Sequence, residues 1–147
     1  MTWHPVLLLV TSDCLSWTSI PSNLQYVLLG NNISLSWDYK LAPGENSSGF
    51  LQIFWAIKER NGWANLAVKS LKSGITILDD EDHISVSKTE KATFTITDVQ
   101  EKHQGRYRCS LESKVSLEPT YFQLIVWSKY ENIYQVFCNW ISHFYLR

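Results

Sequence analysis

The residues between Pro21 and Val126 form short runs in which apolar and polar side chains alternate, and turn signals separate these runs. In the run Ile33–Asp38 every second residue is apolar. This period of two places alternate side chains on opposite faces of a strand, one of them buried. No window of the stretch holds a sustained helical period, and no internal repeat is present. The pattern predicts an all-β sandwich of short strands, and further runs of this kind are Ile53–Lys58, Thr93–Thr97, Arg106–Leu111 and Tyr121–Val126.

Two turn signals divide the first half of this region. The segment Pro43–Gly49 reads Pro-Gly-Glu-Asn-Ser-Ser-Gly and predicts a loop. Asn61-Gly62 is the dipeptide best suited to a tight hairpin, because both positions tolerate a positive φ. We expect Leu66 and Val68 to lie on the returning strand.

Length and composition limit what the chain can do. Its 147 residues suffice for one domain with terminal extensions, and an apolar fraction of 45% can build a core. Thirteen basic residues against fourteen acidic ones give a net charge of -1, which argues against a nucleic-acid partner.

No motif of a catalytic or cofactor site occurs, so the sequence predicts a protein that is not an enzyme and needs no cofactor. The four histidines form no metal-binding motif, and no nucleophile elbow, P-loop or dinucleotide fingerprint is present. The acidic run Asp79–Asp82 lacks the ligand alternation and central glycine of a calcium loop, which favours a solvated loop. Three cysteines, Cys14, Cys109 and Cys138, cannot all pair within one chain.

Several landmarks together resemble a variable-type immunoglobulin domain over about 17–127. Trp55 matches the tryptophan that packs on the inter-sheet disulfide of that family, and Gly105-Arg106-Tyr107-Arg108-Cys109 matches its strand F motif. The hairpin at Asn61-Gly62 suits the extra strands of the variable type. The resemblance implies an immunoglobulin-like two-sheet Greek-key sandwich whose core signature is Trp37, Trp55, Gly105, Tyr107 and Cys109.

The chain departs from this family in place of the first cysteine. The strand B position that should hold it is Trp37, at the spacing from Cys109 that the variable type requires. We therefore expect no disulfide, with Cys109 reduced and buried and the bulk of Trp37 replacing the covalent bond.

A second departure concerns the ion pair at the base of the domain. His103 stands where the family motif begins with aspartate, and the place of the arginine partner reads Asp82-His83-Ile84. The family ion pair is therefore not expected here. A domain of this kind without its first cysteine looks most like invertebrate cell-surface immunoglobulin proteins, cnidarian ones among them.

The two ends differ in character from the middle. Residues 1–16 include the apolar run Val6–Val10 but no basic start, which fits a degraded or mis-started signal peptide or else a plain leader. Residues 128–147 carry apolar side chains at helical spacing, and this tail is either an amphipathic helix or an irregular or truncated end. It is too short and too polar to cross a membrane.

Two N-x-[ST] sequons are candidate glycosylation sites for a secreted protein. They begin at Asn32 and Asn46, and Asn46 lies in the polar loop.

The resemblance also implies a binding face on the sheet that carries strands C, F and G. Alternation predicts its outward residues to be Phe54, Ala56, Lys58, Arg106, Arg108, Tyr121 and Gln123. The alternative is that Phe54 is covered by the Pro43–Gly49 loop or by Trp63 and that the arginines are merely solvated.

The function implied is that of a non-catalytic extracellular recognition or adhesion module. It would be a glycoprotein of the secretory pathway and part of a cell-surface or immune-type receptor. Its partner is a protein, either a second copy or a different molecule, and any membrane attachment would lie outside this chain. The alternatives are a stand-alone secreted binding protein and an intracellular structural immunoglobulin domain, which the missing disulfide favours.

Overall fold

Burial along the strands follows the alternation of the sequence. The computed structural model describes residues 14–43, 50–114 and 117–128. In β3 (Ile33–Lys40) the side chains of Leu35, Trp37 and Tyr39 are buried and those between them are exposed. The sequence pattern alone therefore determines which side of this strand enters the core.

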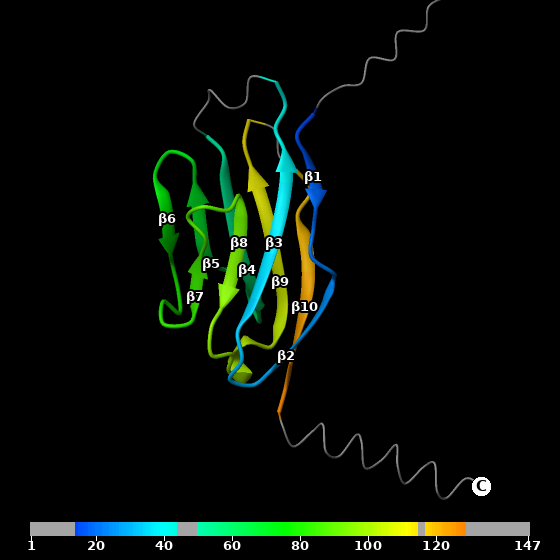
Figure 1. Ribbon diagram of the computed structural model, residues 1–147, viewed down its shortest axis with the longest axis vertical. Coiled ribbons are helices and arrows are strands. Elements are labelled where there is room, and N and C mark those ends of the chain that lie inside the picture. Colours follow the sequence, from blue (N-terminus) through cyan, green and yellow to red (C-terminus); the bar gives the residue numbers. More distant parts are fainter. Residues whose placement is uncertain (1–13, 44–49, 115–116, 129–147) are drawn as a thin grey trace, which may run out of the picture.

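The strands form two sheets, and the prediction of an all-β immunoglobulin-like sandwich is confirmed (Figure 1). The four-stranded sheet has the order β1 (Ser16–Ser19), β3, β8 (Ala92–Ile96) and β7 (Ile84–Val86). The six-stranded sheet has the order β2 (Leu24–Leu28), β10 (Thr120–Trp127), β9 (Gly105–Glu112), β4 (Gln52–Glu59), β5 (Gly62–Ser70) and β6 (Gly74–Ile77). A 3-10 turn, η2 (Glu101–His103), precedes β9.

The N-terminal part of the domain contributes to both sheets. β1 pairs antiparallel with β3, and β2 then pairs parallel with β10 on the opposite sheet. The core reaches Leu15, which is 5% exposed and lies two residues ahead of the predicted domain boundary. Residues 1–13 of the predicted leader and 129–147 of the predicted tail lie outside the described part of the chain.

The predicted hairpin at Asn61-Gly62 is present between β4 and β5. Glu59 pairs with Gly62 and Lys58 pairs with Trp63 in an antiparallel register. Gly62 has φ +140°, a backbone conformation that side-chain-bearing residues rarely adopt. This tight turn places Trp63 on the same sheet face as Lys58.

Aromatic rings fill the space between the two sheets. The rings of Trp55 and Phe94 stack with centroids 5.8 Å apart, and those of Tyr107 and Phe122 stack at 4.9 Å. Trp37 joins both groups, with its ring 6.3 Å from that of Trp55 and 5.9 Å from that of Phe122. Such contacts add to the burial of apolar area and hold the two sheets in register.

Candidate functional site

Four of the five core signature residues, Trp37, Trp55, Tyr107 and Cys109, are buried between the sheets, and Gly105 lies at the start of β9. Trp55 is 1% exposed and Cys109 is not exposed at all, and the two pair across β4 and β9. Cys109 is a free thiol, and burial raises its pKa well above the ordinary value. A buried thiol of this kind packs as a small apolar side chain and is chemically inert.

Trp37 occupies the neighbouring position on the opposite sheet. Its side chain is 3% exposed, and its Nε1 donates a hydrogen bond of 2.7 Å to Thr120 Oγ1 on β10. A tryptophan N–H in a core needs such an acceptor. Trp37 therefore links the two sheets by packing and by one hydrogen bond, at the position where the family has a covalent bond.

The motif at the start of β9 forms a tyrosine corner. Tyr107 is 1% exposed, and its hydroxyl donates a 2.5 Å hydrogen bond to the backbone carbonyl of His103. Burial raises the pKa of this hydroxyl well above its ordinary value. Gly105, two residues earlier, has φ +155° as the chain enters the strand. The corner fixes the turn η2 against the first residues of β9.

An ion pair does form at this corner, from residues that the sequence analysis did not connect. Asp80 Oδ2 lies 2.6 Å from His103 Nε2, and Asp80 Oδ1 lies 2.8 Å from Lys102 Nζ. The backbone N–H of Gln100 donates to His103 Nδ1, so Nε2 carries the proton that reaches Asp80. Burial tends to raise the pKa of the Asp80 carboxyl, but its hydrogen bonds with Lys102 and His103 and the positive charge of Lys102 hold it below its ordinary value.

His83, which stands at the place of the family's arginine partner, lies against His103. Their ring centroids are 5.1 Å apart in an edge-to-face arrangement, and His83 Nδ1 is 2.9 Å from the carbonyl oxygen of Thr97. Within residues 14–43, 50–114 and 117–128 no group of histidine, cysteine and acidic side chains could hold a metal ion. The run Asp79–Asp82 thus contributes an ion pair to the fold.

The predicted face residues lie on the outer surface of the six-stranded sheet. Arg108 pairs with Ala56 on one side and with Tyr121 on the other, and Gln123 pairs with Arg106. Phe54 is half-buried and lies opposite Ser110 on β9 and Val68 on β5. β4, β9 and β10 therefore bring the predicted residues onto one surface.

Ala56 points outward as alternation predicts, but it is covered there and only 1% exposed. Its methyl group is the shortest side chain on the face, and Arg108 lies directly opposite on β9. The guanidinium of Arg108 stacks over the ring of Trp63, with Cζ 4.7 Å from the ring centroid. We attribute the burial of Ala56 to these two long side chains.

The ring of Trp63 contacts three side chains of this surface, Lys58, Arg108 and Tyr121. Its ring centroid lies 5.7 Å from that of Tyr121, which belongs to a strand on the far side of β4 and β9. Lys58 Nζ lies 5.6 Å from the Trp63 ring centroid, and Arg106 Cζ lies 4.9 Å from that of Tyr121. We call this set the cation–aromatic layer, and it consists of Lys58, Trp63, Arg106, Arg108 and Tyr121.

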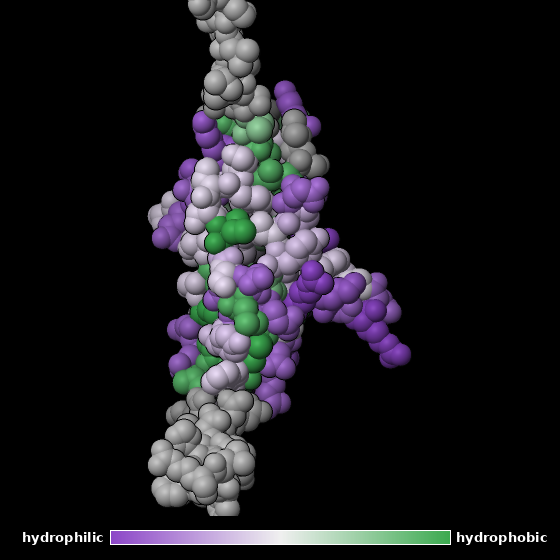
Figure 2. Space-filling model, turned by 90° about the vertical axis from the view of Figure 1, so that its right-hand side faces the viewer, coloured by the Kyte–Doolittle hydropathy of each residue, from purple (hydrophilic) through white to green (hydrophobic). Residues whose placement is uncertain are grey.

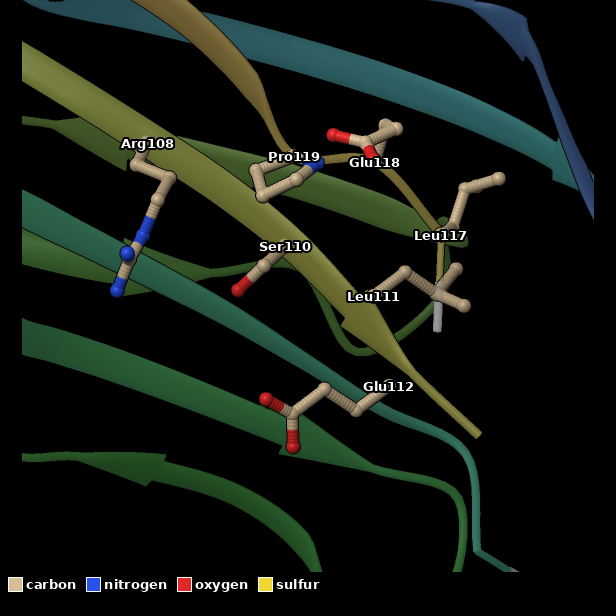
Figure 3. A pocket seen from close by; sticks show the side chains of 7 residues that line it. All are labelled: Arg108, Ser110, Leu111, Glu112, Leu117, Glu118 and Pro119. Carbon is tan, nitrogen blue, oxygen red and sulfur yellow. The ribbon is translucent and has the colours of Figure 1, made fainter. Parts of the chain in front are cut away.

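A pocket of about 300 Å³ adjoins the layer where β9 ends and β10 begins (Figure 3). Figure 3 shows Arg108, Ser110 and Glu112 projecting from the same side of β9. The pocket also contains Glu118, and Leu117 and Pro119 form part of its wall. Arg108 Nε is buried there without a hydrogen-bond partner.

The side of the molecule formed by β1, β2 and β10 is different in chemistry. Figure 2 views this side and shows hydrophobic residues gathered on its lower half. Leu24, Tyr26 and Leu29 are among the exposed apolar and aromatic side chains on and just after β2. The Tyr26 ring packs edge-on against Trp127, with centroids 5.3 Å apart.

Of the two sequons, only the first is in the described part of the chain. Asn32 is exposed, and its Oδ1 accepts a 2.9 Å hydrogen bond from the backbone N–H of Asp98. This bond uses the side-chain oxygen of Asn32 and not its amide nitrogen, the atom that carries an N-linked glycan. Asn46 lies outside the described residues.

No protein-family model matches this chain. No curated protein matches it either. Among the residues described above, no helix is long and apolar enough to cross a membrane.

Solved structures, in contrast, match it over most of its length. Murine CRIg aligns with a TM-score of 0.60 and 11% identity, covering 77% of this chain and 98% of that one. The RIG-5 IG1 homodimer aligns with a TM-score of 0.56 and 14% identity, covering 78% and 98%. The extracellular domain of the voltage-gated sodium channel beta4 subunit, whose parallel homodimers explain its role in cell–cell adhesion, aligns with a TM-score of 0.54 and 19% identity, covering 72% and 91%.

These similarities agree with the tyrosine corner, the central tryptophan and the order of the strands. At such low identity these similarities indicate the fold and do not indicate an activity. The described part of this chain thus has the variable-type immunoglobulin fold, with a tryptophan where the family has its first cysteine.

Proposed function

We propose that this domain is a non-catalytic extracellular recognition module that binds a protein partner through the outer face of its six-stranded sheet. The observation that carries the proposal is the cation–aromatic layer on that face. Tryptophan, tyrosine and arginine are the residue types that contribute most to protein–protein binding.

The layer is already ordered in the free domain. Stacking of Lys58, Arg106 and Arg108 on two rings restricts long side chains that would otherwise lose freedom on binding. Each exposed cation–π contact is worth about 0.5–1 kcal/mol. A surface organised in this way is suited to a partner without further rearrangement.

The fold of the neighbours supports a binding role. In their solved structures the RIG-5 IG1 domain and the beta4 extracellular domain are homodimers. We propose that this chain likewise belongs to a cell-surface or immune-type receptor, and that a stand-alone secreted form would use the same face.

The test is a double substitution on the face, Phe54→Glu with Arg108→Glu. A matched control, Ser85→Glu with Lys88→Glu, makes the same change in charge at exposed positions on and beside β7. Domain-coated beads are assayed for self-aggregation and for binding to cells, after circular dichroism shows that both variants fold. We expect the face variant alone to lose binding, and undiminished binding by that variant would place the interaction elsewhere, at the loops.

A second candidate is an intracellular structural domain, and the reduced core favours it. Cys109 is free and the described core contains no disulfide, so this fold does not depend on an oxidising compartment. Expression of the full chain in a eukaryotic cell separates the two candidates. Secretion with a glycan that Asn32→Gln or Asn46→Gln removes supports the extracellular role, and an unglycosylated cytosolic product supports the structural one.

A further inference from the structure

The three cations of the cation–aromatic layer are not neutralised by the domain itself. Within the described residues, no carboxylate forms an ion pair with Lys58, Arg106 or Arg108. The ion pairs that do form join Asp38 to Lys91 on the other sheet and Asp80 to Lys102 at the corner, where His103 also donates a hydrogen bond to Asp80. The layer thus has positive charge that is not balanced where it lies.

The hydrogen-bonding edges of the two arginines are available to a ligand. A guanidinium stacked on a ring uses its flat face and keeps its N–H groups in the plane, where they match a carboxylate. Arg108 Nε is buried without a partner, and Ser110 lies beside it in the same pocket. Because this Nε is buried, a partner would pair with the other N–H groups of Arg108 and with those of the exposed Arg106.

The charge is local, because the whole chain has a net charge of -1. Glu112 and Glu118 line the pocket at the far end of β9. Arg108 lines the same pocket, so a long uniform polyanion lying along β9 would be repelled by both carboxylates, and a short acidic segment confined to Arg106 and Arg108 would be repelled less. A second copy that docked its own layer against this one would oppose guanidinium groups, which like-charge repulsion disfavours.

We infer that the partner of this face is a protein segment rich in carboxylates, with an acidic side chain paired with Arg106 and another paired with Arg108. This inference rests on the proposed function and specifies the chemistry of the partner. The aromatic rings of Trp63 and Tyr121 would form the apolar centre of the contact, and the arginines would favour a partner with negative charge.

The experiment uses the full chain and a short synthetic polyglutamate peptide as the probe, with polyglutamine and polylysine peptides of equal length as controls. Binding is followed by NMR through the side-chain N–H signals of arginine and tryptophan. We expect polyglutamate alone to bind, to shift the signals of Arg108 Nε and Trp63 Nε1, and to weaken as salt is added.

Matched variants distinguish binding at this face from a general attraction of the peptide to positive charge anywhere on the chain. Arg106→Gln and Arg108→Gln keep a polar side chain and should each weaken polyglutamate binding about tenfold, the loss expected for one charge-assisted hydrogen bond. Lys72→Gln and Lys88→Gln remove the same charge from exposed turns and should have no such effect. Equal weakening by both pairs, or equal binding of polyglutamine, overturns the inference, and so does tighter binding of heparin than of polyglutamate.

The outcome also separates this inference from the function it rests on. If the beads lose binding with Phe54→Glu and Arg108→Glu but keep it with Arg106→Gln and Arg108→Gln, the face is used and its partner is not acidic. The inference then fails and the proposed function stands. If neither pair of substitutions changes bead binding, both the inference of an acidic partner and the proposed function of this face fail.

Discussion

Replacement of Trp37 tests whether packing has taken over the role of the missing disulfide. Trp37→Ala removes a side chain that is 3% exposed and leaves a cavity against Trp55 and Phe122. A buried tryptophan cut back to alanine costs about 3–5 kcal/mol, and Thr120 Oγ1 also loses its donor, which adds about 1 kcal/mol. We expect a loss of about 4–6 kcal/mol in the free energy of unfolding, against the 5–15 kcal/mol that a domain typically has.

Urea denaturation followed by circular dichroism measures this loss, and two further variants keep the test informative if Trp37→Ala does not fold. Trp37→Phe retains a ring but not the N–H, and should cost about 1–2 kcal/mol. Combined with Thr120→Val in a double-mutant cycle, it should give a coupling energy of about 1 kcal/mol. Trp127→Ala removes a partly exposed ring and serves as the control, with an expected loss of about 1 kcal/mol in the free energy of unfolding. A loss below about 2 kcal/mol for Trp37→Ala, or no coupling with Thr120, would refute the reasoning.

Three other predictions follow from the core and the corner. Cys109 should react slowly with thiol reagents in native buffer and rapidly in denaturant, and mass spectrometry that finds it in a disulfide would contradict the structure. Tyr107→Phe should cost about 1–2 kcal/mol in urea denaturation, because the carbonyl of His103 loses a buried donor. The pKa of Asp80 is lowered in the fold, so its stabilising contribution is complete above the pKa of an unfolded aspartate and is lost as the pH falls through the folded value. Asp80→Asn should therefore cost about 1–2 kcal/mol near neutral pH and progressively less in acid, and a cost independent of pH would show that the charge of Asp80 is not what matters.

The sheets and the core could be predicted because strand alternation is local. In β3 and β9 each buried side chain is followed by a less buried one, so the burial of Trp37, Tyr107 and Cys109 follows from the pattern alone. The Asn61-Gly62 turn is likewise a local signal, since its conformation depends on two residues. These features need no knowledge of what packs against them.

Trp63 and Asp80 could not be found in this way, because their roles depend on contacts between distant strands. Trp63 reaches Tyr121 over two intervening strands, and only the full strand order of the six-stranded sheet shows that they meet. The tight hairpin was the available signal, because it places Trp63 opposite Lys58. The burial of Ala56 could not be predicted either, because it depends on side chains from neighbouring strands. Alternation gives the direction in which a side chain points and not the size of the side chains around it.

The parallel pairing of β2 with β10 has a mechanical consequence. The chain passes from β1 into β2 and leaves the sandwich after β10, and β2 and β10 run in the same direction side by side. Once β1 has separated from β3, tension along the chain would pull β2 and β10 past each other along their length. The hydrogen bonds between Leu24–Leu28 and Gln123–Trp127 would then bear the load together in shear, instead of opening one after another. The β2–β10 pair at the edge of the sheet would therefore resist stretching of the domain. The packing of the central tryptophans would not be disrupted until these two strands slide.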